Sequence, residues 1–199
     1  MIDDIGLFEA IDTQRALRYI KADPVPEEMV QRILEAAIKA PSGGNRQPWA
    51  FIVVRDRGVK EAIGAYYKKA WDETYGSAPD PGALGGRSYR SAAHLAEHIA
   101  DAPVWIIACL RHDGTPGNML RGGSIYPAVQ NMLLAARGLG LASALTSLHT
   151  RYEGEVSEIL GLPDNVSTAA LLPIGYPDGV KYGPPRRAPL EEVVHYDSW

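Results

Sequence analysis

Residues 41–54 read PSGGNRQPWAFIVV, and this stretch decides the fold. Pro41 follows a predicted helix that begins near Glu27 and whose apolar residues recur at i, i+3 and i+4, the spacing of one buried face. Proline cannot continue a helix, and the small polar residues that follow indicate a loop. From Trp49 to Val54 every residue is apolar, which predicts a buried strand.

Extending the same reasoning outward from this stretch predicts ten elements. Helices are expected over residues 6–19, 27–38, 59–71, 92–100, 127–139 and 156–160, and strands over residues 49–54, 104–110, 141–148 and 168–176. This order predicts an α+β fold, with one sheet that carries helices on its faces. No repeat or linker divides the chain, so residues 1–199 are expected to form a single domain.

Composition excludes several classes of protein. The net charge of -4 and the pI near 5.7 argue against a nucleic-acid-binding protein, which needs a basic face for phosphates. Cys109 is the single cysteine and lies in an apolar run, so we expect it in the core. The first five residues lack the features of a signal peptide, and no apolar run approaches the ~20 residues that span a bilayer. We therefore expect a cytoplasmic protein that binds no membrane.

Three segments have unusual composition for their length. Residues 127–139 are apolar on more than one helix face, which favours burial in a subunit interface. Residues 74–89 are rich in glycine and proline and long for a plain connection, as in many active-site lids. Residues 182–199 begin with a proline-rich stretch that is expected to cross the surface or a neighbouring subunit. Together they predict a homodimer with a lid and an arm.

Two short motifs have ordinary explanations. His94 and His98 lie in an H-x-x-E-H pattern that could place two imidazoles on one zinc ion. A catalytic zinc needs a third protein ligand, and no other histidine has a matching context, so we expect a polar helix face and no metal. The run from Arg137 through Gly138 to Gly140 follows a helix rather than a strand. It therefore indicates a helix terminator and not a dinucleotide-binding loop.

Three other segments are more informative together than alone. Arg15 and Arg18 are spaced i, i+3, so on a helix they could clamp a phosphate, although many exposed helices hold two arginines. In residues 41–49, two glycines allow close approach of the backbone to a ligand, and polar side chains could hold a planar heterocycle. The third segment is the basic pair Arg186 and Arg187 in the tail.

In this order, the three segments resemble the nitroreductase family. The matching residues are Ala40-Pro41-Ser42, Asn45, Gln47-Pro48-Trp49, Gly138-Leu139-Gly140, residues 172–176 and residues 187–193. The resemblance covers nearly the whole length, and the Pro-Ser-x-x-Asn-x-Gln-Pro-Trp element is its most specific part. Residues 146–149 and 194–199 are similar to an actinobacterial branch of the family.

The resemblance implies FMN held between the subunits of an interwoven homodimer, with NAD(P)H as electron donor. Because a flavin carries the redox chemistry, no protein residue is expected to be catalytic. Gln14 and Ala16 stand where the family commonly has arginine and serine, so fewer phosphate contacts are expected there. The cofactor-binding residues that the resemblance implies are Arg15, Ala16, Arg18 and Arg187 near the phosphate, Pro41, Ser42, Gly43, Asn45 and Gln47 in a loop from the other subunit, and Leu145, Thr146 and Ser147 along the ring.

The implied reaction is ping-pong hydride transfer from NAD(P)H through FMN to a nitroaromatic, a quinone or a related small oxidant. Trp71 and Tyr75, which precede the glycine-rich segment, are the candidate substrate residues. Three alternatives stay open. They are a flavoenzyme of the same fold for dehalogenation or flavin fragmentation, a non-catalytic flavin-binding protein, and a zinc hydrolase built on the two histidines of H-x-x-E-H.

Overall fold

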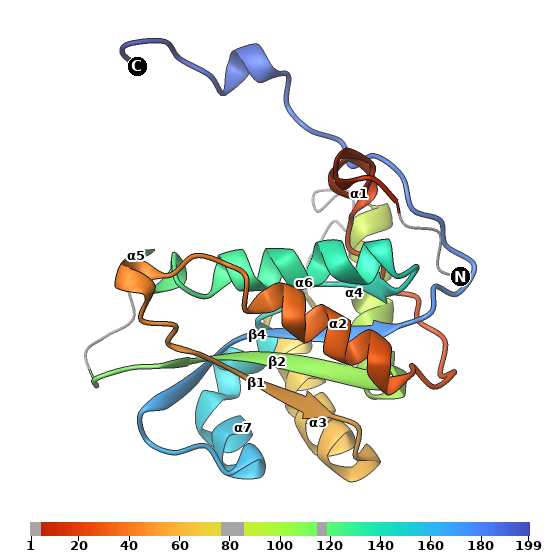
Figure 1. The fold of residues 1–199 in the computed structure, drawn as a ribbon. Helices are drawn as coiled ribbons and strands as arrows, with labels where there is room; N and C mark the ends of the chain where they lie inside the picture. The colour runs from red at the N-terminus through yellow and green to blue at the C-terminus, as the bar shows by residue number, and fades with distance from the viewer. Residues whose placement is uncertain (1–4, 77–85, 115–118) are drawn as a thin grey trace.

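A single antiparallel sheet forms the centre of the molecule (Figure 1). The computed structural model describes residues 5–76, 86–114 and 119–199. The sheet has the order β1-β2-β4-β3, and each strand is antiparallel to its neighbour. Its strands are β1 (Trp49–Val54), β2 (Val104–Arg111), β3 (Ala142–Ser143) and β4 (Val166–Gly175). The α+β prediction is confirmed.

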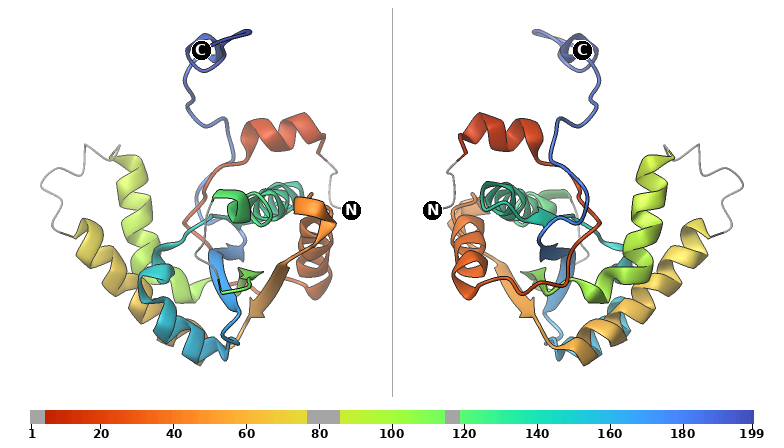
Figure 2. Two further views of the ribbon diagram at one scale, coloured as in Figure 1. Left: turned by 90° about the vertical axis from the view of Figure 1, so that its left-hand side faces the viewer. Right: turned by 90° about the vertical axis from the view of Figure 1, so that its right-hand side faces the viewer.

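Helices cover both faces of this sheet (Figures 1 and 2). On one face lie α2 (Glu27–Ala37) and α6 (Tyr126–Gly138), with α1 (Leu7–Thr13) packed against α6. On the other face lie α3 (Arg57–Tyr75), α4 (Arg87–His98) and α7 (Glu153–Leu160). The short elements are α5 (Met119–Gly122) and the 3-10 turns η1 (Gly43–Asn45), η2 (Ile99–Asp101), η3 (Leu148–Tyr152) and η4 (Leu190–Glu192).

Strand β2 is the centre of the hydrophobic core. Its side chains alternate between the faces, as a strand requires. Val104, Ile106 and Ala108 pack with α2 and α6, whereas Trp105, Ile107 and Cys109 pack with α3, α4 and α7. The prediction that Cys109 is a core residue is confirmed, and burial raises the pKa of its thiol to about 12. This cysteine is therefore a protonated, inert thiol at neutral pH.

The prediction of helix 6–19 is wrong beyond Thr13. Residues 14–19 are not helical, because their backbone groups bond to distant segments instead. The Leu17 amide donates to the Ser143 carbonyl (3.0 Å), and the Lys21 amide donates to the Tyr176 carbonyl (2.9 Å). These bonds align the segment with β3 and with the end of β4. Similarly, the predicted strand 141–148 is paired only at β3 and at an isolated bridge between Thr146 and Leu171.

The segment that connects α3 and α4 is shorter at both ends than the predicted lid, residues 74–89. Helix α3 continues to Tyr75, and α4 begins at Arg87. Aromatic packing stabilises the added helical residues. The ring centroid of Trp71 lies 4.7 Å from that of Tyr75 and 5.5 Å from that of Tyr89. Residues 77–85, the middle of the predicted lid, lie outside the described residues.

Apolar side chains remain exposed on two elements of this single chain. On α1, Leu7, Phe8 and Ile11 are exposed. The prediction of a subunit interface for residues 127–139 is corrected for five residues of α6, which are buried in the core of their own chain against α2 and the sheet. The tail beyond residue 183 extends away from the body (Figures 1 and 2), and its hydrogen bonds are all local. Leu190, Val193, Tyr196 and Trp199 are all exposed along it. Among the described residues, no helix is both long and apolar enough to cross a bilayer.

Candidate functional site

Two arginines near the N-terminus have no acidic partner among the described residues. The sequence predicted that they share a helix face. In the structure they lie instead on the non-helical segment after α1. Nη2 of Arg15 donates to the Lys181 carbonyl (2.6 Å), and its buried Nε has no hydrogen-bond partner within residues 5–76, 86–114 and 119–199. Nη1 of Arg18 donates to the Ser91 hydroxyl (3.1 Å) on α4, and burial lowers the pKa of Arg18. Two partly buried cations without counter-ions favour an anionic ligand.

Thr146 lies near Arg18 at the edge of the sheet. Its amide and carbonyl both bond to Leu171 (3.1 and 2.8 Å), which fixes its backbone beside β4. Its hydroxyl lies 2.9 Å from the hydroxyl of Tyr67 on α3. The flanking Leu145 and Ser147 are exposed. The structure therefore brings predicted residues 145–147 to the side of the molecule that holds Arg18.

The candidate substrate residues lie on the same helix as Tyr67. Tyr67, Trp71 and Tyr75 are spaced four apart on α3, so they share one face. Trp71 is 7% exposed and packs in the core, while Tyr75 is only partly buried and accepts a hydrogen bond at its carbonyl from the Tyr89 hydroxyl (3.2 Å). An aromatic group thus extends along α3 from the Thr146 contact to the start of residues 77–85.

The loop before β1 is held in an uncommon conformation. Asn45 and Gln47 have φ angles of 53° and 50°, in the left-handed region that few non-glycine residues occupy. The Ser42 hydroxyl accepts from the Gln47 amide (3.0 Å), and the Gln47 side chain donates to the Asn45 side chain (3.2 Å). The Gly43 amide donates to the Ser124 hydroxyl (3.2 Å). Backbone strain of this kind is concentrated at functional sites, where surrounding contacts maintain it.

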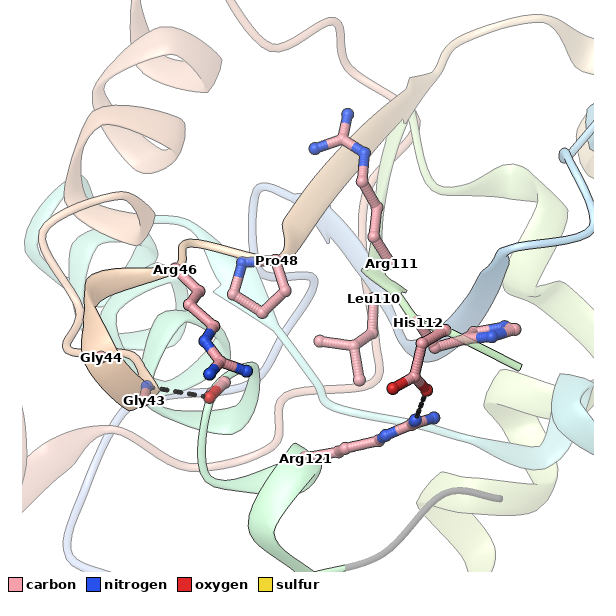
Figure 3. A pocket seen from close by; sticks show the side chains of 10 residues that line it. Gly43, Gly44, Arg46, Pro48, Leu110, Arg111, His112 and Arg121 are labelled. Carbon is pink, nitrogen blue, oxygen red and sulfur yellow. Dashed lines mark hydrogen bonds and ion pairs between the residues drawn. The ribbon is translucent and has the colours of Figure 1, made fainter. Parts of the chain in front are cut away.

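This loop borders a pocket of about 520 Å³ (Figure 3). In Figure 3, Arg46 and Arg121 flank Leu110, and Arg111 points away from them. Arg121 forms an ion pair with Asp113, and Arg46 forms none with any described residue. The lining consists of Gly43, Gly44, Arg46, Pro48, Leu110, Arg111, His112, Asp113, Arg121 and Ser124. Because Arg121 is paired with Asp113 and Arg111 points away, Arg46 contributes the net positive charge of the pocket, which suits an anionic or strongly polar group.

Within one chain, these residues form two separate groups. The loop is joined to Ser124, just before the N-terminus of α6. The arginine segment lies near the other end of α6, where Nε of Arg137 donates to the Thr13 hydroxyl (2.8 Å). A helix of 13 residues is about 20 Å long. One chain therefore does not bring residues 41–47 together with Arg18 and Thr146.

Arg187 belongs to neither group in this chain. It is exposed in the tail, and its Nη1 donates to the carbonyl of Arg186 (2.8 Å). It follows Lys181, whose carbonyl accepts from Arg15, by six residues. The start of the tail, near Lys181, thus lies beside the segment that contains Arg15.

The two histidines of the H-x-x-E-H motif contact neighbouring aromatic and acidic side chains. The His94 ring stacks on Tyr19 with ring centroids 4.2 Å apart, and Nδ1 of His98 lies 3.1 Å from an Asp101 carboxylate oxygen. In the described part of the chain, no group of three or more histidine, cysteine or acidic side chains is arranged to hold a metal ion.

Sequence reasoning missed three residues that support the site. Tyr67, Ser91 and Ser124 come from α3, from α4 and from the turn before α6, and each contacts a predicted site residue through its hydroxyl. The spacing of Tyr67 four residues before Trp71 was visible in the sequence. The contacts with residues 18, 43 and 146 were not, because they join segments 73 to 81 residues apart.

Comparison with known proteins identifies the family. The model of the nitroreductase family matches residues 11–176. The chain belongs to this family. A Thermus thermophilus protein named NADH dehydrogenase is 35% identical to this nitroreductase-family chain over 193 residues, covering 91% of each chain. A Methanothermobacter thermautotrophicus protein, provisionally named NADH dehydrogenase/NAD(P)H nitroreductase, is 33% identical over 181 residues, covering 88% of this chain and 80% of its own.

Solved structures show the same fold. An oxidised iodotyrosine deiodinase bound to FMN and 3-iodo-L-tyrosine has a TM-score of 0.81 and 25% identity, covering 98% of this chain and all of its own. A Bacteroides thetaiotaomicron protein, provisionally named NADH dehydrogenase/NAD(P)H nitroreductase, has a TM-score of 0.74 and 23% identity over similar shares. The nitroreductase fold is therefore shown over nearly the whole chain.

Proposed function

We propose that this nitroreductase-family chain is an FMN-dependent NAD(P)H oxidoreductase that reduces nitroaromatics, quinones or related small oxidants. The observation that carries the proposal is that Arg15 and Arg18 have no acidic partner in the part of the chain that the structure describes. Arg18 also lies close to Tyr67, whose hydroxyl contacts Thr146. When bound, FMN supplies two-electron redox chemistry, so no protein side chain needs to act as a nucleophile.

The residues present fit a flavin phosphate at this position. The orphaned Nε of Arg15 is a buried donor that lacks an acceptor, and a phosphate oxygen would satisfy it. Arg18 loses part of its hydration and in return donates one hydrogen bond to a neutral group, the Ser91 hydroxyl. Arg187 would add a third cation where the tail passes, and Ala16 would contribute its backbone. Arginine suits such a site because its planar fork matches phosphate oxygens.

The other site residues of the chain would contact and position the flavin ring. On one side lie Leu145, Thr146 and Ser147, with the Thr146 hydroxyl available for a polar edge. The strained loop of residues 41–47 would close the other side from a second subunit, since one chain holds it near the far end of α6. Its basic pocket would then accept the polar end of a donor or oxidant. The functional unit is accordingly a homodimer.

The test is flavin content and turnover of the purified protein. We expect close to one FMN per chain, and oxidation of NADH or NADPH that depends on a quinone or nitroaromatic acceptor. Arg18→Ala should lower FMN affinity about ten- to a hundredfold, since a charge-assisted hydrogen bond contributes about 1.5–3 kcal/mol. Arg32→Ala is the matched control, because Arg32 is exposed and pairs with Glu35 (3.0 Å) on α2. A protein that stays colourless after incubation with FMN contradicts the proposal.

Reductive dehalogenation is the second candidate. The iodotyrosine deiodinase structure has the higher TM-score of the two structures compared above. The partly buried rings of Tyr75 and Tyr89, which pack on the buried Trp71, could stack on a substrate ring. In that reaction two electrons and a proton replace a carbon–iodine bond with carbon–hydrogen and release iodide. Iodide release from 3-iodo-L-tyrosine by the reduced protein, without quinone reductase activity, favours this candidate. A protein that binds FMN but reduces no acceptor is a flavin-binding protein instead.

A further inference from the structure

The hydrogen bond between Tyr67 and Thr146 has a direction that burial decides. The Tyr67 side chain is 3% exposed, and its hydroxyl bonds to Thr146 alone among the described residues. Burial raises the pKa of Tyr67, so the phenol keeps its hydrogen at neutral pH. If Thr146 donated, the phenol hydrogen would be buried without an acceptor, which is costly. Tyr67 therefore donates, and the Thr146 oxygen accepts.

This direction leaves the hydrogen of the Thr146 hydroxyl free. The backbone amide and carbonyl of Thr146 are both bonded to Leu171, so the residue cannot turn away as a unit. Its side chain is only partly buried, and no described acceptor takes its hydrogen. The Thr146 hydroxyl can thus donate its hydrogen to an acceptor atom of a bound ligand.

Arg18 supports the same arrangement. Its guanidinium carries a charge close enough to lower the pKa of the Tyr67 phenol, partly offsetting the effect of burial. A guanidinium cannot accept a hydrogen bond, so it offers the phenol hydrogen no alternative to Thr146. Arg18 also places a positive charge close to the Tyr67 phenol that contacts Thr146, and this favours a ligand with an acceptor or anionic edge.

We propose that Tyr67 is a positioning residue, which holds the Thr146 hydroxyl as a hydrogen-bond donor to an acceptor atom of the flavin ring. The inference rests on the proposed function, because the ring is the ligand expected beside Thr146. Tyr67 acts only through Thr146, and this distinguishes it from a residue that merely fills the core.

The test is a double-mutant cycle on the holoprotein, read by FMN affinity and by the visible absorption of the bound flavin. Tyr67→Phe should weaken FMN binding about two- to tenfold, as loss of one oriented hydrogen bond predicts, and should shift the visible band in the direction that Thr146→Val shifts it. Thr146→Ser keeps the hydroxyl and should retain wild-type values. In the Thr146→Val background, Tyr67→Phe should have no further effect. Tyr176→Phe, on the other face of the sheet, is the matched control.

Each outcome has a distinct meaning. A wild-type protein that binds no FMN overturns the proposed function, and the inference with it. A yellow wild type whose Tyr67→Phe variant has unchanged affinity and an unchanged spectrum overturns the positioning role alone. Additive effects in the double mutant overturn it too, because they would show that Tyr67 acts independently of Thr146. If Tyr67→Phe fails to fold, Thr146→Val and Thr146→Ser still decide whether the hydroxyl contacts the flavin, and equal affinities and spectra for those two variants overturn the inference.

Discussion

His149 donates a hydrogen bond from Nε2 to the Thr168 hydroxyl oxygen, 3.0 Å away, in the layer between the sheet and α7. Thr168 in turn donates its hydroxyl hydrogen to Glu153, whose other carboxylate oxygen accepts from the Thr168 amide (2.7 Å). The Thr168 oxygen can therefore only accept from His149, which fixes the neutral tautomer of the imidazole. The other ring nitrogen, Nδ1, is buried and has no hydrogen-bond partner among the residues that the structure describes.

We predict that this histidine destabilises the protein at mildly acidic pH. Protonation would put a hydrogen on Nδ1 with no acceptor, and burial lowers the pKa of His149 from 6.5 to about 4. At pH values between these two pKa values, His149 is protonated in the unfolded chain and neutral in the folded chain. The free energy of unfolding therefore falls as the pH falls from about 6.5 to about 4. The full loss is roughly 3 kcal/mol at 1.36 kcal/mol per pKa unit.

Chemical denaturation at a series of pH values measures this effect. His149→Leu should flatten the dependence of the unfolding free energy on pH between 4 and 6.5, because it removes the titrating group. His195→Gln, in the exposed tail, is the control and should leave the profile unchanged. Identical profiles for wild type and His149→Leu would show that the buried imidazole titrates normally.

A second prediction concerns the strain in the loop before β1. Asn45 has a φ of 53°, which glycine adopts freely and alanine adopts at a cost of about 1–2 kcal/mol. Both Asn45→Gly and Asn45→Ala lose the hydrogen bond from Gln47. The difference between their unfolding free energies in the flavin-free protein therefore reports the strain, reduced by the greater conformational freedom of glycine in the unfolded chain. We expect Asn45→Ala to be the less stable by about 1 kcal/mol, and equal stabilities would mean that the loop relaxes.

The sequence predicted best those elements that depend on local pattern. The prediction for β1 matches Trp49–Val54 at both ends, and β2 extends one residue further than expected. These strands are continuous apolar runs, and each is bounded by polar or turn-forming residues. Helix α2 was equally clear, because one stripe of apolar residues fits the helical period.

Sequence reasoning failed where distant segments decide the local structure. Arg15 and Arg18 were placed on a helix because residues 6–19 show a loose helical pattern. The chain instead follows Ser143 and Tyr176, about 130 and 155 residues away, with which the amides of Leu17 and Lys21 bond. The candidate residues were suggested by motif, but their separation into two groups depends on the path of α6. A linear pattern does not contain that information.

The third prediction compares two neighbouring arginines in the tail. Arg186 and Arg187 are both exposed, and neither forms an ion pair with any described residue. Replacing either one should therefore change stability little. If Arg187 contacts the flavin phosphate, as we propose, Arg187→Ala should weaken FMN binding about ten- to a hundredfold, and Arg186→Ala should weaken it much less. Titration with FMN, followed by flavin fluorescence, measures both affinities. Equal affinities would show that assigning Arg187 rather than Arg186 to the phosphate is wrong.

The last prediction is that the tail links dimerisation to flavin binding. Leu190, Val193, Tyr196 and Trp199 are exposed in the single chain, whereas the segment up to Gly183 is anchored beside α1 by a bond from its amide to the Thr13 carbonyl (3.4 Å). Exposed apolar side chains on an extended arm gain stability when a partner covers them, at roughly 25 cal/mol per Å² of buried apolar surface. A site completed by two chains should also lose FMN upon dilution below the dimer dissociation constant.

Deleting residues 184–199 tests this link without disturbing the anchored segment. The truncated protein should sediment as a monomer or a weak dimer and should purify without flavin. Leu190→Glu together with Val193→Glu should weaken the dimer in the full-length chain, and Glu191→Ala is the matched control at an exposed polar position of η4. If the flavin-binding loop comes from the second subunit, FMN affinity should fall in step with dimer affinity across these variants. A truncated, well-folded monomer that retains FMN would place the whole flavin site within one chain.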